Sequence, residues 1–227
     1  MRLECLYSLQ SLKLERPKLI VTMQEILLSL PYFGPISHFR ELVKPASIRF
    51  EHEDNYQKQT YRNRMFIYDA NGKLLLNIPI KHLPKSNPKQ HQKYKDVLID
   101  PEYKWQKQHW KSLKTAYQTS PFFEYYEDEL APLYQKKFKY LMDFNYSCLD
   151  VICECLQLKL DFDKTSDYIV KPENTIDKRE LINAKTQIQI PVYNQVFKDK
   201  QGFLPNLSML DLMFNEGPNA VNYLKEL

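Results

Sequence analysis

The sequence contains very little glycine, with four such residues among 227. Loops that cradle phosphate groups need glycine at several fixed positions, because the ligand approaches their backbone closely. Glycine-rich nucleotide-binding loops of the usual kinds are therefore excluded. The sequence also lacks G-x-S-x-G, H-E-x-x-H and dinucleotide-binding motifs, so the common hydrolase and dehydrogenase templates have no support.

Cysteine is equally scarce, with four residues in the chain. Cys148, Cys153 and Cys155 lie in one apolar stretch with a helical pattern, where buried thiols are common. This distribution does not suit a secreted disulfide framework. The C-x-C spacing of Cys153 and Cys155 also suits zinc poorly, and no histidine lies near it. We therefore predict no metal site, and the sequence identifies no cofactor.

Long apolar runs are absent from the first 22 residues. Polar and charged side chains interrupt every apolar stretch there: Glu4, Gln10, Lys13, Glu15 and Arg16. Neither a signal-peptide core nor a spanning helix fits this pattern, so we expect a cytoplasmic protein without a membrane span. We interpret residues 1–22 as a leader of uncertain order, with Met23 as an alternative start, and residues 23–227 as a single α/β domain.

Positive charge is concentrated in one part of the chain, although the net charge is only +4. The segment from 57 to 95 carries one acid, Asp69, and nine cations: Lys58, Arg62, Arg64, Lys73, Lys81, Lys85, Lys89, Lys93 and Lys95. Such a segment indicates an anionic partner, which is nucleic acid, a phosphorylated metabolite or a lipid headgroup. For about half of the lysines, an ordinary solvated surface is the alternative.

The first part of the chain has the pattern of a strand–helix–strand unit. An apolar run over 25–33 precedes helical spacing over 35–44, and Pro35 is of the residue type favoured at a first helical position. Residues 47–53 then alternate between apolar and charged side chains, as a half-buried strand does. This order of elements is the unit of an α/β sheet.

A β-hairpin follows, near residues 64–80. Asn71-Gly72 lies between two β-rich runs, which is the strongest short-range signal for a hairpin. Residues 81–95 contain almost nothing to bury, and we predict a mobile surface loop there that closes over a ligand. A further strand is predicted over 95–100.

The second half of the chain is predominantly helical in pattern. Within 102–120, four residues spaced four apart share one face: Trp105, His109, Leu113 and Tyr117. The remaining predictions are a short helix over 121–130, a long helix over 131–158, an extended stretch over 158–168, a helix over 176–184, a strand over 186–197 and a C-terminal helix with Ser208 and Asp211 as a capping pair. The predicted fold class is α/β, a mixed sheet with flanking helices.

Arg62 and Arg64 are the strongest candidates for binding a ligand. If the strand begins by Tyr61, both side chains project to one side, with Asn63 opposite. Two arginines on one face form a fork that suits two oxygens of a phosphate or carboxylate. The alternative is internal pairing with acids of the preceding segment, namely Glu51, Glu53 or Asp54.

Neighbouring side chains complete the predicted substrate site. We expect phosphate groups to be bound by Lys58, Arg62 and Arg64, and hydroxyl or amide groups by Asn55, Gln57 and Asn63. His109 is the candidate general acid or base, because small perturbations move a histidine pKa across neutrality. The alternative for His109 is a core histidine with a satisfied nitrogen. Asp54 and Glu53, beside the basic cluster, are alternative candidates for the base, or for holding a divalent ion against a phosphate.

Six segments between Pro31 and Gly217 occur in an order that is specific when they are taken together. They are PYFGPISHF, NYQKQTYRNR, NGK with LLLNIPIK, WQKQHWKSLKTAYQTSPFFEYY, LMDFN and FLPNLSMLDLMFNEG. In this order they resemble the WbqC-like proteins, a bacterial family associated with O-antigen and other surface-polysaccharide gene clusters. The resemblance covers most of the chain.

This resemblance implies an α/β enzyme-like domain that acts in glycan assembly. It also implies substrate-binding roles for Tyr32 and Trp105, which lie in matching segments, and it includes His109 in register. The chain departs from the family pattern at Leu30, where relatives usually have Gln or Glu. We expect an altered or inactive member if that polar side chain contacts a ligand.

The leading functional hypothesis is a group-transfer enzyme that acts on a phosphorylated or nucleotide-linked sugar in surface-polysaccharide biosynthesis. One alternative is a module for single-stranded nucleic acid, in which Tyr56, Tyr61 and Tyr68 stack on bases. Because amides are mixed with the cations, we consider nucleic acid the weaker interpretation. A second alternative is a non-catalytic partner in a polysaccharide-assembly complex. The sequence does not indicate an oligomeric state.

Overall fold

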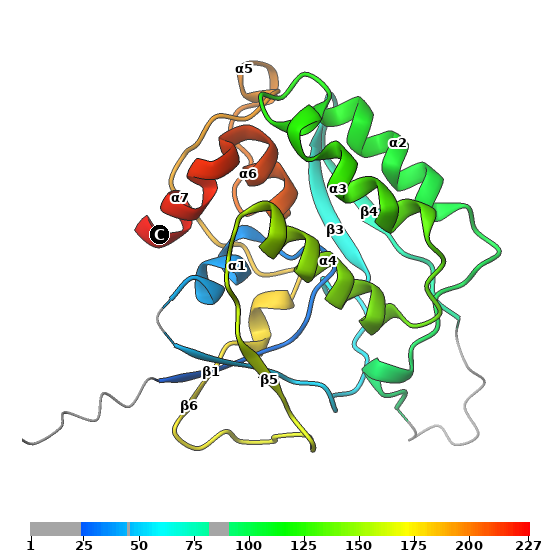
Figure 1. Cartoon of the computed structure of the whole chain (residues 1–227), viewed down its shortest axis with the longest axis vertical. Helices are drawn as coiled ribbons and strands as arrows, with labels where there is room; N and C mark the ends of the chain where they lie inside the picture. Colours follow the sequence, from blue (N-terminus) through cyan, green and yellow to red (C-terminus); the bar gives the residue numbers. More distant parts are fainter. Residues whose placement is uncertain (1–23, 45, 82–90) are drawn as a thin grey trace, which may run out of the picture.

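A four-stranded parallel sheet lies at one end of the molecule (Figure 1). The computed structural model describes residues 24–44, 46–81 and 91–227. The sheet has the strand order β5-β2-β1-β6 and consists of β1 (Glu25–Leu28), β2 (Ser47–Phe50), β5 (Phe162–Lys164) and β6 (Thr175–Asp177). Ile26 of β1 pairs with Ile48 of β2 and with Ile176 of β6. Most of β1 is buried, and its sequence is accordingly a continuous apolar run rather than an alternation of apolar and polar residues.

Helix α1 (Ile36–Leu42) connects β1 to β2 and confirms the predicted strand–helix–strand unit. Pro35 stands at the N-cap of α1, where its missing N–H removes no helical hydrogen bond. The helix is mostly buried and contacts the C-terminal helices α6 (Met209–Glu216) and α7 (Ala220–Glu226). The predicted extended stretch after residue 158 supplies β5 at the sheet edge.

The predicted hairpin is confirmed and forms its own two-stranded antiparallel sheet, β3 (Arg64–Asp69) and β4 (Gly72–Asn77). Asp69 pairs with Gly72, so the loop consists of Ala70 and Asn71. Gly72 has a φ of 102°, a conformation that glycine adopts at little cost. The parallel and antiparallel strands of the chain are therefore divided between two sheets.

Three helices cover the hairpin side of the molecule (Figure 1): α2 (Trp105–Tyr117), α3 (Phe123–Gln135) and α4 (Leu141–Cys155). The predicted face of α2 is confirmed, because its four residues at intervals of four are all buried. Helix α4 also contacts the parallel sheet, where the ring of Tyr146 stacks on that of Phe162. Together with β1, β2 and α1, these elements confirm the α/β class and the helical second half.

The predicted break between helices at Ala131 is wrong. Helix α3 continues through Pro132, because Leu130, Leu133 and Tyr134 all lie on its buried face. The chain leaves the helix at Lys136, whose backbone is extended, and α4 begins only at Leu141.

Two predicted strands are absent from the described residues. Residues 95–100 form only isolated bridges, Ile80 with Ile99 and Leu98 with Tyr140, after a 3-10 turn, η1 (Tyr94–Asp96). Residues 186–197 form no strand, although Tyr193 is buried and Ile190 and Val196 pack against the core, while Val192 is largely exposed. The helix predicted over 176–184 is instead the end of β6 and a 3-10 turn, η2 (Arg179–Ile182).

The C-terminal segment contains α5 (Lys198–Gln201), α6 (Met209–Glu216), the 3-10 turn η3 (Gly217–Asn219) and α7 (Ala220–Glu226). Ser208 caps α6, since its hydroxyl accepts from the Leu210 N–H at 3.3 Å. The predicted capping role of Asp211 is wrong. Its carboxylate accepts instead from Tyr117 at 2.6 Å, from Gln195 at 2.9 Å and from Tyr193.

No helix in the described ranges is long and apolar enough to cross a membrane. The predicted leader, Met23 and most of the predicted 81–95 loop lie outside the described residues.

Candidate functional site

A pocket of about 520 Å³ lies where the chain leaves the parallel sheet. Residues that follow each of the four strands line this strand-end pocket. They are Ser29 after β1, Asp54, Asn55, Gln57, Lys58, Gln59, Thr60 and Arg62 after β2, Tyr168 after β5, and Arg179, Glu180, Ile182, Asn183 and Lys185 after β6. In open α/β sheets, ligands bind at the carboxyl ends of the strands, beside the strand where the order reverses direction. Here that strand is β1, because β2 and β6 lie on its two sides.

The loop that follows β2 is held in place by contacts with distant parts of the chain. Thr60 forms a β-bridge with Asn183, and the Tyr61 N–H donates to the Ile182 carbonyl at 2.8 Å. At the start of the loop, Asn55 forms a β-bridge with Lys93. These contacts fix the polar side chains of the loop against the ends of β1 and β6.

Arg62 and Asp54 of this loop form a buried ion pair, with 2% and 4% of their residue surfaces exposed. The guanidinium also donates from Nη1 to Thr60 Oγ1 at 3.3 Å and lies 5.2 Å from the ring centre of Tyr94. The internal pairing that the sequence left open is therefore present for Arg62. This arrangement holds Arg62 in one orientation at the pocket wall.

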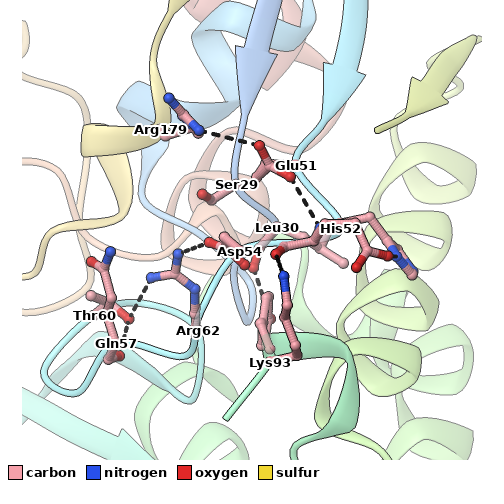
Figure 2. A network of polar contacts seen from close by, with 12 residues as sticks. Ser29, Leu30, Glu51, His52, Asp54, Gln57, Thr60, Arg62, Lys93 and Arg179 are labelled. Atoms are coloured by element: carbon pink, nitrogen blue, oxygen red, sulfur yellow. Dashed lines mark hydrogen bonds and ion pairs between the residues drawn. The ribbon is translucent and has the colours of Figure 1, made fainter. Parts of the chain in front are cut away.

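Three buried polar atoms at this wall have no hydrogen-bond partner among the residues that the structure describes: Ser29 Oγ, Asp54 Oδ1 and Arg62 Nε. Figure 2 shows Ser29, Asp54 and Arg62 beside one another, with the ion pair drawn between the latter two. Burial raises the pKa of the Asp54 carboxyl, while the charge and hydrogen bond of Arg62 act in the opposite direction. Unpartnered buried polar atoms are unfavourable and uncommon in folded proteins, so their concentration here indicates a place for a polar ligand.

A second buried network joins the loops around the pocket (Figure 2). Glu51 accepts from Thr165 Oγ1 at 2.6 Å, from the Ile169 N–H at 3.1 Å and from Arg179 Nη1 at 3.2 Å. The Arg179 guanidinium also donates two hydrogen bonds to Asp177, at 2.9 and 2.6 Å, and the Arg179 N–H donates a third at 3.1 Å; together they lower the pKa of that carboxyl. Segments after β2, β5 and β6 are thus fastened to one another beside the site.

Arg64 belongs to a different pocket, so the predicted two-arginine fork is wrong. Strand β3 begins only at Arg64, whereas Arg62 lies in the preceding loop and turns to Asp54. Arg64 and Asn63 line a hairpin pocket of about 760 Å³, together with Tyr56, Tyr103 and Trp105. The turn residues Lys58 and Gln59 line both pockets and separate them.

Comparison with known proteins identifies the family. Residues 30–189 and 178–223 match the WbqC-like protein family. The chain belongs to this family. The match confirms the resemblance and extends over most of the WbqC-like chain. "Uncharacterized protein Rv1507c" of Mycobacterium tuberculosis is 27% identical over 198 residues, which cover 75% of this chain and 84% of that protein. No solved structure matches the chain.

The predicted site residues fall into three groups in this WbqC-like structure. The strand-end pocket is lined by Asp54, Asn55, Gln57, Lys58 and Arg62. The hairpin pocket is lined by Lys58, Asn63, Arg64 and Trp105. Tyr32 and His109 line neither pocket.

His109 lies in the core between α2 and the segment after β1. Its Nδ1 is 3.0 Å from the Tyr32 hydroxyl, which in turn lies 3.0 Å from the hydroxyl of Tyr134. Burial lowers the pKa of His109 to about 4, opposed by a backbone hydrogen bond at Asn77. The structure therefore agrees with a core histidine rather than a proton donor at neutral pH.

Leu30 is also a core residue. Its side chain is buried, and its carbonyl accepts from the Tyr94 hydroxyl at 2.9 Å. The adjacent Ser29 is the residue of this segment that lines the strand-end pocket.

Ser29, Tyr168, Arg179, Asn183 and Lys185 line the strand-end pocket but were not predicted from the sequence. All of them follow parallel strands, which is the one signal that would have identified them. Since β5 and β6 contain three residues each, their ends are hard to locate from sequence patterns. No group of three or more His, Cys, Asp or Glu side chains within the described ranges is arranged to hold a metal ion.

Proposed function

We propose that the strand-end pocket binds a hydroxyl-bearing anionic metabolite, a sugar phosphate, and that the protein transfers a group to or from it. The observation that carries this proposal is the set of three unpartnered buried atoms, on Ser29, Asp54 and Arg62, at one pocket wall. A sugar hydroxyl can donate to Asp54 Oδ1 while its oxygen accepts from a nearby donor. A sugar therefore satisfies donors and acceptors together.

The positive side chains of the pocket suit the phosphate. Arg62 and Arg179 already pair with acids, but Lys58 and Lys185 make no ion pair with any described residue. Asn55 and Asn183 add amide groups for the sugar, and the partly exposed ring of Tyr168 offers an apolar face. The lining thus combines cations, amides and one aromatic ring.

Asp54 is the group that we assign as the base. A carboxyl whose pKa is raised by burial accepts a proton more readily than an exposed one. In the proposed step, Asp54 Oδ1 takes the proton of a substrate hydroxyl as that oxygen bonds to the electrophilic atom of the transferred group. The leaving group departs with the electron pair of the broken bond. No role in this step is assigned to His109.

Family membership supports the setting rather than the reaction. The polysaccharide association that the resemblance implies favours a sugar intermediate as the substrate. The nucleic-acid alternative has less support, because Tyr61 and Tyr68 are buried and cannot stack on bases.

The test is a thermal-shift series with sugar phosphates and the corresponding free sugars. We expect sugar phosphates to raise the melting temperature, with a smaller rise in Ser29→Ala and Lys185→Ala variants. Lys111→Ala, on the exposed face of α2, serves as the control for removal of a lysine. The proposal is rejected if no sugar phosphate stabilises the protein, or if both pocket variants respond as Lys111→Ala does.

A further inference from the structure

We infer that the hairpin pocket is the base-binding subsite of a nucleotide-linked sugar, whose sugar end occupies the strand-end pocket. The inference rests on the proposed function for the position of the sugar, and it adds the class of substrate. Its three supports are the aromatic side chains of the hairpin pocket, a buried amide oxygen in its wall and the turn shared by the two pockets.

Aromatic side chains give the hairpin pocket flat apolar surfaces. Tyr103, which precedes α2, is 63% exposed, and the half-buried Tyr56 lines the same hollow. Trp105 also lines it but is only 5% exposed. Trp105 is held edge-to-face against Phe144, with ring centres 5.2 Å apart, so its position is fixed. A planar ring of a ligand can stack on Tyr103 or on Tyr56, whatever its detailed identity.

Asn63 supplies a polar requirement that distinguishes a base from a simple apolar ring. It is 4% exposed, and its Nδ2 donates to Asn77 Oδ1 at 3.0 Å and to the Ile78 carbonyl at 2.9 Å. Its Oδ1 is buried and has no hydrogen-bond partner within the described part of the chain. A nucleobase carries N–H donors in the plane of its ring, and one of them would satisfy this oxygen. Arg64 Nε, also unpartnered, adds a donor for a ring carbonyl or a phosphate.

The turn between the pockets is suited to the phosphates that join a base to a sugar. Lys58 and Gln59 line both hollows, and Lys58 makes no ion pair with a described residue. The turn itself is firmly placed, because Thr60 Oγ1 donates to the Gln57 carbonyl at 2.9 Å and Thr60 bridges to Asn183. A ligand that crosses the turn would bring its negative charge to Lys58.

Calorimetric titration of the full chain tests the inference with three kinds of ligand. These are uridine, thymidine and guanosine diphosphate sugars, the matching nucleoside monophosphates, and the sugar 1-phosphates. We expect at least one nucleotide sugar to bind more tightly than its sugar 1-phosphate. Tyr103→Ala should weaken nucleotide sugar and monophosphate about tenfold, as loss of one stacking contact does, and leave the sugar 1-phosphate unchanged. Tyr103→Phe should restore wild-type affinity.

The matched control is Tyr125→Ala, which removes an equally exposed tyrosine from α3. The inference is overturned if nucleotide sugars bind no better than sugar 1-phosphates, or if Tyr103→Ala binds every ligand as Tyr125→Ala does. In that case the proposed function is still supported if Ser29→Ala weakens binding of the sugar 1-phosphate. Conversely, if Tyr103→Ala weakens the monophosphate but Ser29→Ala affects no ligand, the base subsite stands and the proposed function fails. Absence of binding by all three kinds of ligand overturns both.

Discussion

Arg62 and Asp54 form a buried ion pair within one loop, and the pair leaves a second carboxylate oxygen of Asp54 unpartnered at the pocket wall. Removal of either partner leaves the other charge buried and alone. We therefore expect Asp54→Ala to lower the free energy of unfolding by about 3–5 kcal/mol. The double variant Asp54→Ala/Arg62→Met should lose less than the sum of the two single variants. Urea denaturation of the four proteins measures this coupling, and strictly additive losses would contradict it.

His38 and His109 make the protein sensitive to acid. Burial lowers both pKa values to about 4, from the ordinary value of 6.5. Between pH 6.5 and 4 the unfolded chain binds protons at these histidines that the folded chain does not bind. The free energy of unfolding is therefore undiminished by the histidines above pH 6.5 and decreases as the pH falls towards 4. Protonation of each histidine lowers the free energy of unfolding by about 3 kcal/mol across this pH range. Unfolding experiments at a series of pH values should show a shallower dependence for His109→Gln, and an unchanged slope would oppose this account.

Asp211 links three parts of the chain through its three donors. The Tyr117 hydroxyl that donates to it also accepts from the Tyr68 N–H of β3 at 3.0 Å, and Tyr193 and Gln195 come from the irregular segment before α5. Asp211→Ala should therefore lower the free energy of unfolding by about 3 kcal/mol or more, since several buried donors lose their acceptor. Asp211→Asn, which keeps one acceptor, should lose less. Denaturation curves compare them with Asp199→Ala, an exposed acid expected to change stability by less than about 0.5 kcal/mol.

Asp211 also shows where sequence patterns mislead. The carboxylate of an acid three residues after a serine commonly accepts a hydrogen bond from the serine N–H in a capping box. Here the Ser208 N–H is already bonded to the Phe66 carbonyl of β3 at 2.9 Å, so no donor is left for the carboxylate. The pairing of Ser208 with a strand distant in sequence is not visible in the local pattern. Local signals were sufficient for α2 and for the hairpin, because both depend on the spacing of residues within one segment.

The candidate site could be predicted only in part, because local sequence patterns do not show contacts between distant segments. The row of polar residues over 55–64 is visible in the sequence, and most of it lines one of the two pockets. The direction of each side chain depends on distant contacts, such as the bridge between Thr60 and Asn183. Arg62 and Arg64 consequently serve different hollows, although they are only two residues apart. Arg179 was missed because the three residues of β6 give too short a pattern.

Lys58 provides the sharpest test of how the two pockets work together, because it lines both of them. Its side chain makes no ion pair with a described residue, so its charge remains for a ligand. Lys58→Ala should weaken sugar 1-phosphate and nucleoside monophosphate alike, by about fivefold, which corresponds to one partly screened ionic contact. Lys58→Arg should retain most of the affinity.

Titrations at low and high salt should show a smaller salt effect for Lys58→Ala than for the wild type, because one screened attraction is gone. Lys111→Ala serves again as the control. If Lys58→Ala weakens only one of the two ligands, the shared turn does not carry the phosphates between the pockets.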